Sequence, residues 1–322
     1  MRRHVRQFAS IARLTALEAV RQPIFLLMTT ACVMFISLLP LLITHTLGEG
    51  AKLVCDSSLA FYFVCGLVLG SYAACSSLTH EIRRGTAASV LSKPVRREVF
   101  FLAKFTGVAA VMLVFSTAAS MATVMSTRVA VPPYSFDWWA GVPLLIAPFA
   151  AYAAAAAWNF VTQRPFVSAA SGALVAALAL AFILAGFVDA NGNWVSFGSA
   201  YLWKLVPVGA LIFLAIAVLT GLALSLAIRL DTVPTLSICS VVFLVGLMSD
   251  YLLGRHAGGN AAADFFYRIL PNWQHFWVVD ALGGDGTIPW SYVARAAVYA
   301  GLYLAGILSL GLIAFRQMEV RA

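Results

Sequence analysis

The sequence predicts an all-α protein, a polytopic bundle of about eight transmembrane helices, with six also possible. Of its 322 residues, 62% are hydrophobic and only 11% are charged, whereas an average soluble protein is about 25% charged. The apolar residues form runs of about 20, the length that crosses about 30 Å of hydrocarbon as helix. These runs are continuous, whereas a transmembrane β-barrel needs alternating segments of about ten residues. The composition excludes a water-soluble globular domain.

Eight apolar segments carry this prediction, and the whole chain, 1–322, is expected to be one transmembrane domain. They lie at residues 24–46, 59–79, 101–127, 140–161, 166–188, 205–228, 233–253 and 291–315. A tight turn at residues 162–165 separates the fourth from the fifth. Arg229, Asp231 and Pro234 separate the sixth from the seventh. The aromatic-rich segment 254–290 is expected to be a re-entrant or interfacial element on the outer side, or a plain aromatic anchor.

Lys and Arg residues set the expected orientation. With a cytoplasmic N-terminus, about 15 of them fall on the cytoplasmic side and about 6 on the other, as the positive-inside rule requires. An even number of spans also places the C-terminus in the cytoplasm. The net charge of +8 is thus explained by topology, and no nucleic-acid partner is expected. We expect a multi-pass protein of the inner (plasma) membrane with both termini cytoplasmic.

The first 23 residues are expected to form a helix in the cytoplasmic interface, with an ordinary basic tail as the alternative. Apolar residues recur there at helical spacing with basic residues between them. Charged residues persist as far as Arg13, Glu18 and Arg21, which excludes a cleavable signal peptide.

Small residues and a few polar ones mark the apolar spans. Gly66, Gly70 and Ala74 recur every fourth residue, a pattern that lets transmembrane helices pack closely. Asp250 is the clearest ionisable group inside a span, and both a functional and a structural role are open. The five cysteines lack a C-x-x-C pair and are interpreted as small core residues, so no metal site is expected.

The most informative segment is the charged loop at residues 80–100. Gly85 is suited to end one helix, Thr86 to cap a short new one, and Pro94 to open the next. A six-residue helix between them, about 9 Å long, is not stable alone and would fit a groove on a partner. The alternative is a solvated turn whose charges only set topology. The residues expected to form the docking surface are Glu81, Arg83, Arg84, Gly85, Thr86, Val90, Leu91, Pro94 and Arg96.

Three short motifs in this region carry a family resemblance. They are Glu81-x-x-x-Gly85-Thr86, Leu91-Ser92-x-Pro94-Val95-Arg96-Arg97 and Phe100-x-x-x-Lys104-Phe105. Together they resemble the first cytoplasmic loop of ABC transporter permeases of the ABC-2 (exporter) type, where it holds a coupling helix that docks into the ATPase subunit. Residues 17–23 look like that family's elbow helix, and residues 270–276 and 315–319 are similar to the ends of bacterial members. The resemblance covers roughly residues 10–110 and 265–320, and the family's usual core has six helices rather than eight.

The resemblance implies a transport subunit that is not itself an enzyme. Its implied partners are an ABC ATPase, which binds the ATP and Mg²⁺, and a second permease subunit in a homodimer or heterodimer. The chain itself lacks a G-x-x-x-x-G-K-[ST] phosphate loop, so we expect no cofactor bound to it. A secondary transporter needs an internal repeat and buried ionisable groups, and no clear repeat is present. A polytopic assembly protein is the other alternative.

Overall fold

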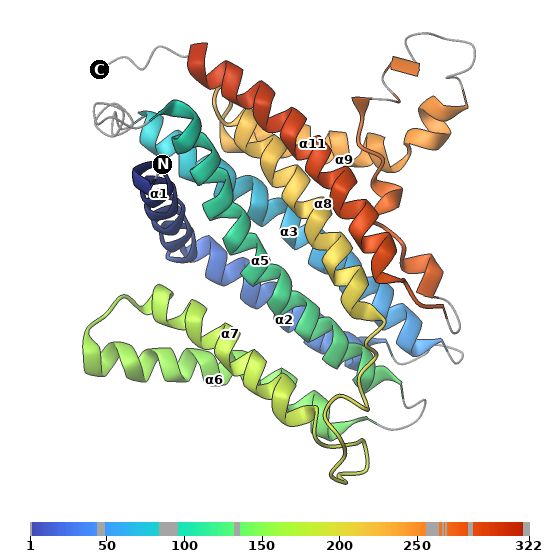
Figure 1. The fold of residues 1–322 in the computed structure, drawn as a ribbon. Helices are drawn as coiled ribbons and strands as arrows, with labels where there is room; N and C mark the ends of the chain where they lie inside the picture. The colour runs from blue at the N-terminus through green and yellow to red at the C-terminus, as the bar shows by residue number, and fades with distance from the viewer. Residues whose placement is uncertain are drawn as a thin grey trace.

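The computed structural model describes residues 2–43, 49–83, 96–131, 136–255, 264–265, 267, 269–282 and 286–317. They form long α-helices joined by turns and short helical segments, so the all-α prediction is confirmed (Figure 1). The helices are α1 (Arg2–Val20), α2 (Pro23–Leu42), α3 (Gly50–Arg83), α5 (Arg97–Ala130), α6 (Trp138–Thr162), α7 (Phe166–Ala185), α8 (Leu205–Leu226), α9 (Thr232–Leu247) and α11 (Trp290–Gln317).

The eight predicted spans correspond to α2, α3, α5, α6, α7, α8, α9 and α11. Seven of these helices in the described part of the chain are long and apolar enough to cross a membrane. The exception is α9, whose 16 residues extend about 24 Å, short of the hydrocarbon thickness. A π-helical turn, Asp250–Gly254, follows it. Among the described residues, seven of the eight predicted spans are therefore long enough to cross a membrane, and the span predicted at 233–253 is a shorter apolar helix.

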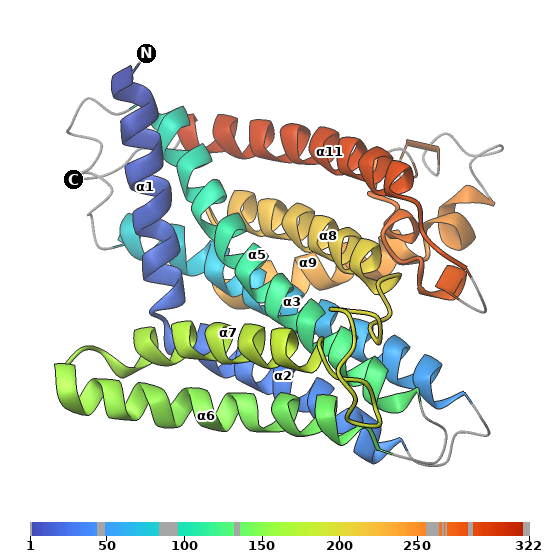
Figure 2. The ribbon, with the colours of Figure 1, turned by 60° about the horizontal axis from the view of Figure 1, so that its bottom comes forward.

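The bundle has two distinct ends. Figure 2 shows α1 crossing one end, where α3 and α11 finish and α5 begins. We call this the α1 end. The opposite end, called the distal end, holds residues 186–204 and the start of α11. Described basic residues that the sequence assigns to the cytoplasm, such as Arg13, Arg97 and Arg316, lie at the α1 end.

Two helices extend well past the apolar runs that predicted them. α3 and α5 each have 34 residues, which is about 51 Å of helix. The predicted spans were shorter because they were placed on hydropathy, and α3 continues through Lys52 and Asp56 at its start. Helix geometry satisfies the backbone in water and lipid alike, so polarity did not end the helix.

Close packing joins α3 to α8 along the predicted stripe of small residues. A Cβ at Gly66 would overlap the side chain of Ile216, and one at Gly70 would lie 2.5 Å from Thr220 Oγ1. Ala74 is fully buried. Lipid tails are as apolar as leucine, so such close contact is the main force that associates these helices.

A second close contact seats α1 on α5. A Cβ at Gly107 would lie 2.5 Å from the carbonyl oxygen of Ala12 and 2.7 Å from Cβ of Thr15. Thr15 and Ala19 are buried there. The predicted helix at residues 1–23 is thus present as α1, packed directly against the bundle.

The segment after α9 folds back and covers the distal end. Trp273 is 1% exposed and its Nε1 donates to Val242 O (3.2 Å), so the segment lies against α9. Tyrosines of α11 hold its backbone. The Tyr299 hydroxyl accepts from the amide of Asn272 (2.9 Å), and the Tyr303 hydroxyl donates to Leu270 O (3.2 Å). The described part of the predicted outer segment 254–290 is therefore a packed cap made of short turns.

Replacing Gly107 with alanine is expected to destabilise the protein by about 1 to 3 kcal/mol, because the new methyl group meets the backbone of α1 and cannot be accommodated by a side-chain rotation. The measurement is thermal unfolding of the purified protein in detergent. Gly301→Ala is the matched control, because no atom lies within 4 Å of a Cβ there and alanine is the better helix former. Equal melting temperatures for the two variants would contradict the proposed seat of α1.

Candidate functional site

Most residues of the predicted docking surface lie outside the described residues. These are Arg84, Gly85, Thr86, Val90, Leu91 and Pro94. Glu81 and Arg83 belong to the last turn of α3, and Arg96 is exposed immediately before α5. Both helices that flank the segment reach the α1 end (Figure 1). Each is about 20 Å longer than a 30 Å hydrocarbon layer requires.

The start of α5 is fastened to the end of α11. Arg97 Nη1 donates to the carbonyl oxygens of Arg316 (2.9 Å) and Phe315 (3.4 Å), which the last turn of a helix leaves without partners. Glu98 forms an ion pair with Arg316. Phe315 stacks on Phe100, with 6.0 Å between ring centroids. These contacts form the first polar centre, which joins the two helices at the residues that follow the predicted docking loop in the sequence.

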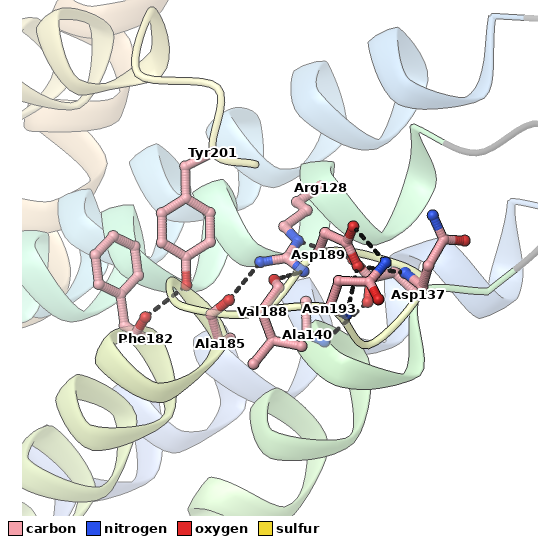
Figure 3. Close-up of polar contacts among 10 residues, drawn as sticks. Arg128, Asp137, Ala140, Phe182, Ala185, Val188, Asp189, Asn193 and Tyr201 are labelled. Carbon is pink, nitrogen blue, oxygen red and sulfur yellow. Dashed lines mark hydrogen bonds and ion pairs between the residues drawn. The ribbon is translucent and has the colours of Figure 1, made fainter. Parts of the chain in front are cut away.

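At the distal end a buried ion pair forms the second polar centre (Figure 3). Arg128 near the end of α5 and Asp137 before α6 are 3% and 2% exposed, and Arg128 Nε donates to Asp137 Oδ2 at 2.8 Å. Arg128 Nη1 donates to Ala185 O (2.6 Å) and Nη2 to Val188 O (2.7 Å). Asp137 Oδ1 accepts from the amide of Ala140 and so caps α6 (3.2 Å). We call this set the Arg128 latch.

In the latch, the positive charge of the Arg128 guanidinium is paired with Asp137, because an unpaired buried charge would be costly. Its guanidinium also lies 5.5 Å from the ring centroid of Tyr201, a cation–π distance. Burial raises the pKa of Tyr201 to about 12, and its hydroxyl donates a hydrogen bond to Phe182 O. One arginine thus joins α5, the start of α6, the end of α7 and the loop that leads to α8.

The loop at residues 186–204 is ordered by local bonds around Asp189. Its Oδ1 accepts from the amides of Asn191 (2.8 Å) and Asn193 (2.9 Å). Hydrogen bonds lower the pKa of Asp189, and the bond from the backbone amide of Asn193 has the largest effect. Gly192, with φ of +87°, lies against the indole of Trp139, where a side chain would both strain the backbone and collide. The loop is thereby held over the latch.

In the sequence, Arg128 counts only as one of the about 6 basic residues expected on the outer side, and nothing there pairs it with Asp137. The available signal was an arginine in the last turn of an apolar span with an aspartate nine residues later.

Asp250, which the sequence marks as the clearest ionisable group inside a span, accepts hydrogen bonds from Tyr267 (2.8 Å) and Asn272 (3.3 Å). In the structure it anchors the cap at the distal end.

The described residues contain no group of three or more His, Cys, Asp or Glu side chains placed to hold a metal ion. All five cysteines are buried with free thiols. Both polar centres consist of guanidinium groups, carboxylates and backbone carbonyls. Their hydrogen bonds and ion pairs fix the positions of the helices relative to one another.

The fold defines a multi-pass membrane protein of the all-α class, with helices joined by polar contacts at both ends. No family model, curated protein or solved structure matches this chain.

Replacing Asp137 with alanine is expected to cost about 3 to 5 kcal/mol, because it leaves the Arg128 guanidinium buried without its counter-ion. Thermal unfolding in detergent measures the loss. Glu98→Ala removes one carboxylate from an exposed pair and should change the melting temperature much less.

The double variant Arg128→Met with Asp137→Ala provides the sharper control. It removes both charges, so it should recover part of the stability that Asp137→Ala loses. A double variant less stable than Asp137→Ala alone would show that the bonds from Arg128 to the carbonyls of Ala185 and Val188 outweigh the charge pairing.

Proposed function

We propose that this chain is the membrane-spanning permease subunit of an ATP-binding-cassette exporter of the ABC-2 type. Two permease subunits would form the translocation pathway, and a separate ATPase would bind ATP and Mg²⁺ and drive it. The α1 end faces the cytoplasm in this proposal, in agreement with its excess of basic residues.

The supporting observation is the length and placement of α3 and α5. Both helices are longer than the hydrocarbon layer of a bilayer is thick, and the end of α3 and the start of α5 lie together at the α1 end. This is where the sequence motifs predict a short helix for a partner to grip. Because Arg97 and Glu98 join α5 to α11, a force on that segment would reach two transmembrane helices together.

Gly85→Pro and Arg84→Glu are expected to prevent docking of the partner ATPase, and so to abolish ATP-driven transport, while membrane insertion is unchanged. The proline disturbs the predicted helix end, and the glutamate reverses a charge on the docking surface. The measurement compares co-purification of the partner ATPase with membrane-fraction levels of each variant. Co-purification at the wild-type level with both variants would count against the docking surface.

A cysteine placed at Ser89 should crosslink to a nucleotide hydrolase in native membranes. The captured chain is identified by mass spectrometry and by a G-x-x-x-x-G-K-[ST] phosphate loop. A cysteine at Ser199, exposed in the distal loop, is the matched control and should capture none. If Ser89 never captures a hydrolase, or if an impermeant reagent labels it from outside intact cells, the exporter proposal fails.

A further inference from the structure

α1 presents two unlike faces along its length. The face toward the bundle carries Thr15 and Ala19, which are 1% and 4% exposed, and it includes the close contact with Gly107. The other face carries Arg6, Arg13 and Arg21, all exposed. At 100° per residue each arginine points roughly 140° to 160° away from the middle of the face that carries Thr15 and Ala19. They form a stripe roughly 22 Å long, which we call the arginine stripe.

Exposed leucines interrupt this basic surface. Leu17 lies between Arg13 and Arg21 at a spacing of four residues in each direction and is 42% exposed. Leu14, beside the stripe, is 55% exposed. Apolar side chains interleaved with arginines fit the layer where acyl chains meet charged headgroups. A face turned wholly to water would not explain the leucines.

The chain fixes the depth of the arginine stripe. α2 begins at Pro23, two residues after Arg21, and its first residues are already apolar. Arg21 therefore lies at the boundary of the hydrocarbon. The joint itself is held, because Gln22 Nε2 donates to Ser76 Oγ of α3 at 2.9 Å, and Ser171 Oγ of α7 donates to Val20 O at 3.3 Å. α1 thus lies at headgroup level across the helix ends (Figure 2).

From these observations we propose that α1 is a binding surface for anionic phospholipid headgroups, which the arginine stripe engages at the α1 end. Guanidinium groups stay charged and form paired hydrogen bonds to phosphate oxygens. Glu18 lies on the flank of α1, outside the stripe. Exposed Arg96, Arg164 and Arg229 at the same end extend the positive field over the headgroup layer. The occupant is the anionic leaflet itself, and the proposal does not depend on an ATPase partner.

The test uses the full-length protein in neutral detergent, titrated with phosphatidylglycerol or with phosphatidylcholine and read by native mass spectrometry. Wild type should retain phosphatidylglycerol in clear preference. The triple variant Arg6→Gln, Arg13→Gln, Arg21→Gln should weaken phosphatidylglycerol binding on the order of 100-fold, about 5-fold per arginine, with phosphatidylcholine binding unchanged. Raising the salt concentration should reduce the wild-type preference.

A matched control removes the same number of charges from the distal end. Lys52, Arg255 and Arg295 are exposed there, and their triple glutamine variant should keep the wild-type preference. The triple lysine variant of the stripe, which keeps charge without the forked geometry, should bind at an intermediate level. If the triple glutamine variant of the stripe fails to purify, the three single substitutions are measured, each with an expected loss of about 5-fold.

Two outcomes overturn the proposal. In the first, wild type binds both lipids equally, and the stripe then serves something other than the headgroup layer, such as an acidic protein surface. In the second, the distal triple variant loses as much phosphatidylglycerol binding as the stripe variant, so that binding follows net charge and not α1.

Discussion

The structure depends on how closely other helices approach α5. In a bilayer no hydrophobic force brings helices together, so van der Waals contact and a few polar bonds must do so. α5 contacts α1, α2, α3, α6, α7, α8 and α11. Gly107 admits α1 at one end, Arg97 holds α11, and Arg128 holds the α6–α7 hairpin at the other. The helix is therefore a shared support on which both polar centres are built.

The two ends differ in kind. The α1 end is basic and exposed, and its described ion pair, between Glu98 and Arg316, is accessible to solvent. The distal end is closed by a buried ion pair and by aromatic packing around Tyr201 and Trp273. Exposed contacts such as those at the α1 end can rearrange at little cost. The buried contacts at the distal end hold the helices in one fixed arrangement.

Hydropathy was enough to predict the helices, because a run of about 20 apolar residues has few alternatives in lipid. It could not predict where α3 begins, since a helix continues through Lys52 and Asp56 without penalty once its backbone is bonded internally. The stripe of Gly66, Gly70 and Ala74 was visible as a spacing, whereas its partner, α8, was not. The Arg128 latch was not predictable because its acceptors, the carbonyl of Ala185 at the end of α7 and that of Val188 in the following turn, lie about 60 residues away and meet Arg128 only in the folded chain.

The short length of α9 has a consequence for the surrounding lipid. Where the helix stops, the segment around Trp273 packs against α9, and tyrosines of α11 bond the amide of Asn272 and the carbonyl of Leu270. Backbone that is not helical is tolerated at such depth only when protein groups bond it. A 16-residue helix is shorter than the hydrocarbon layer, so the bilayer beside α9 is expected either to thin locally or to end against the packed segment that follows the helix.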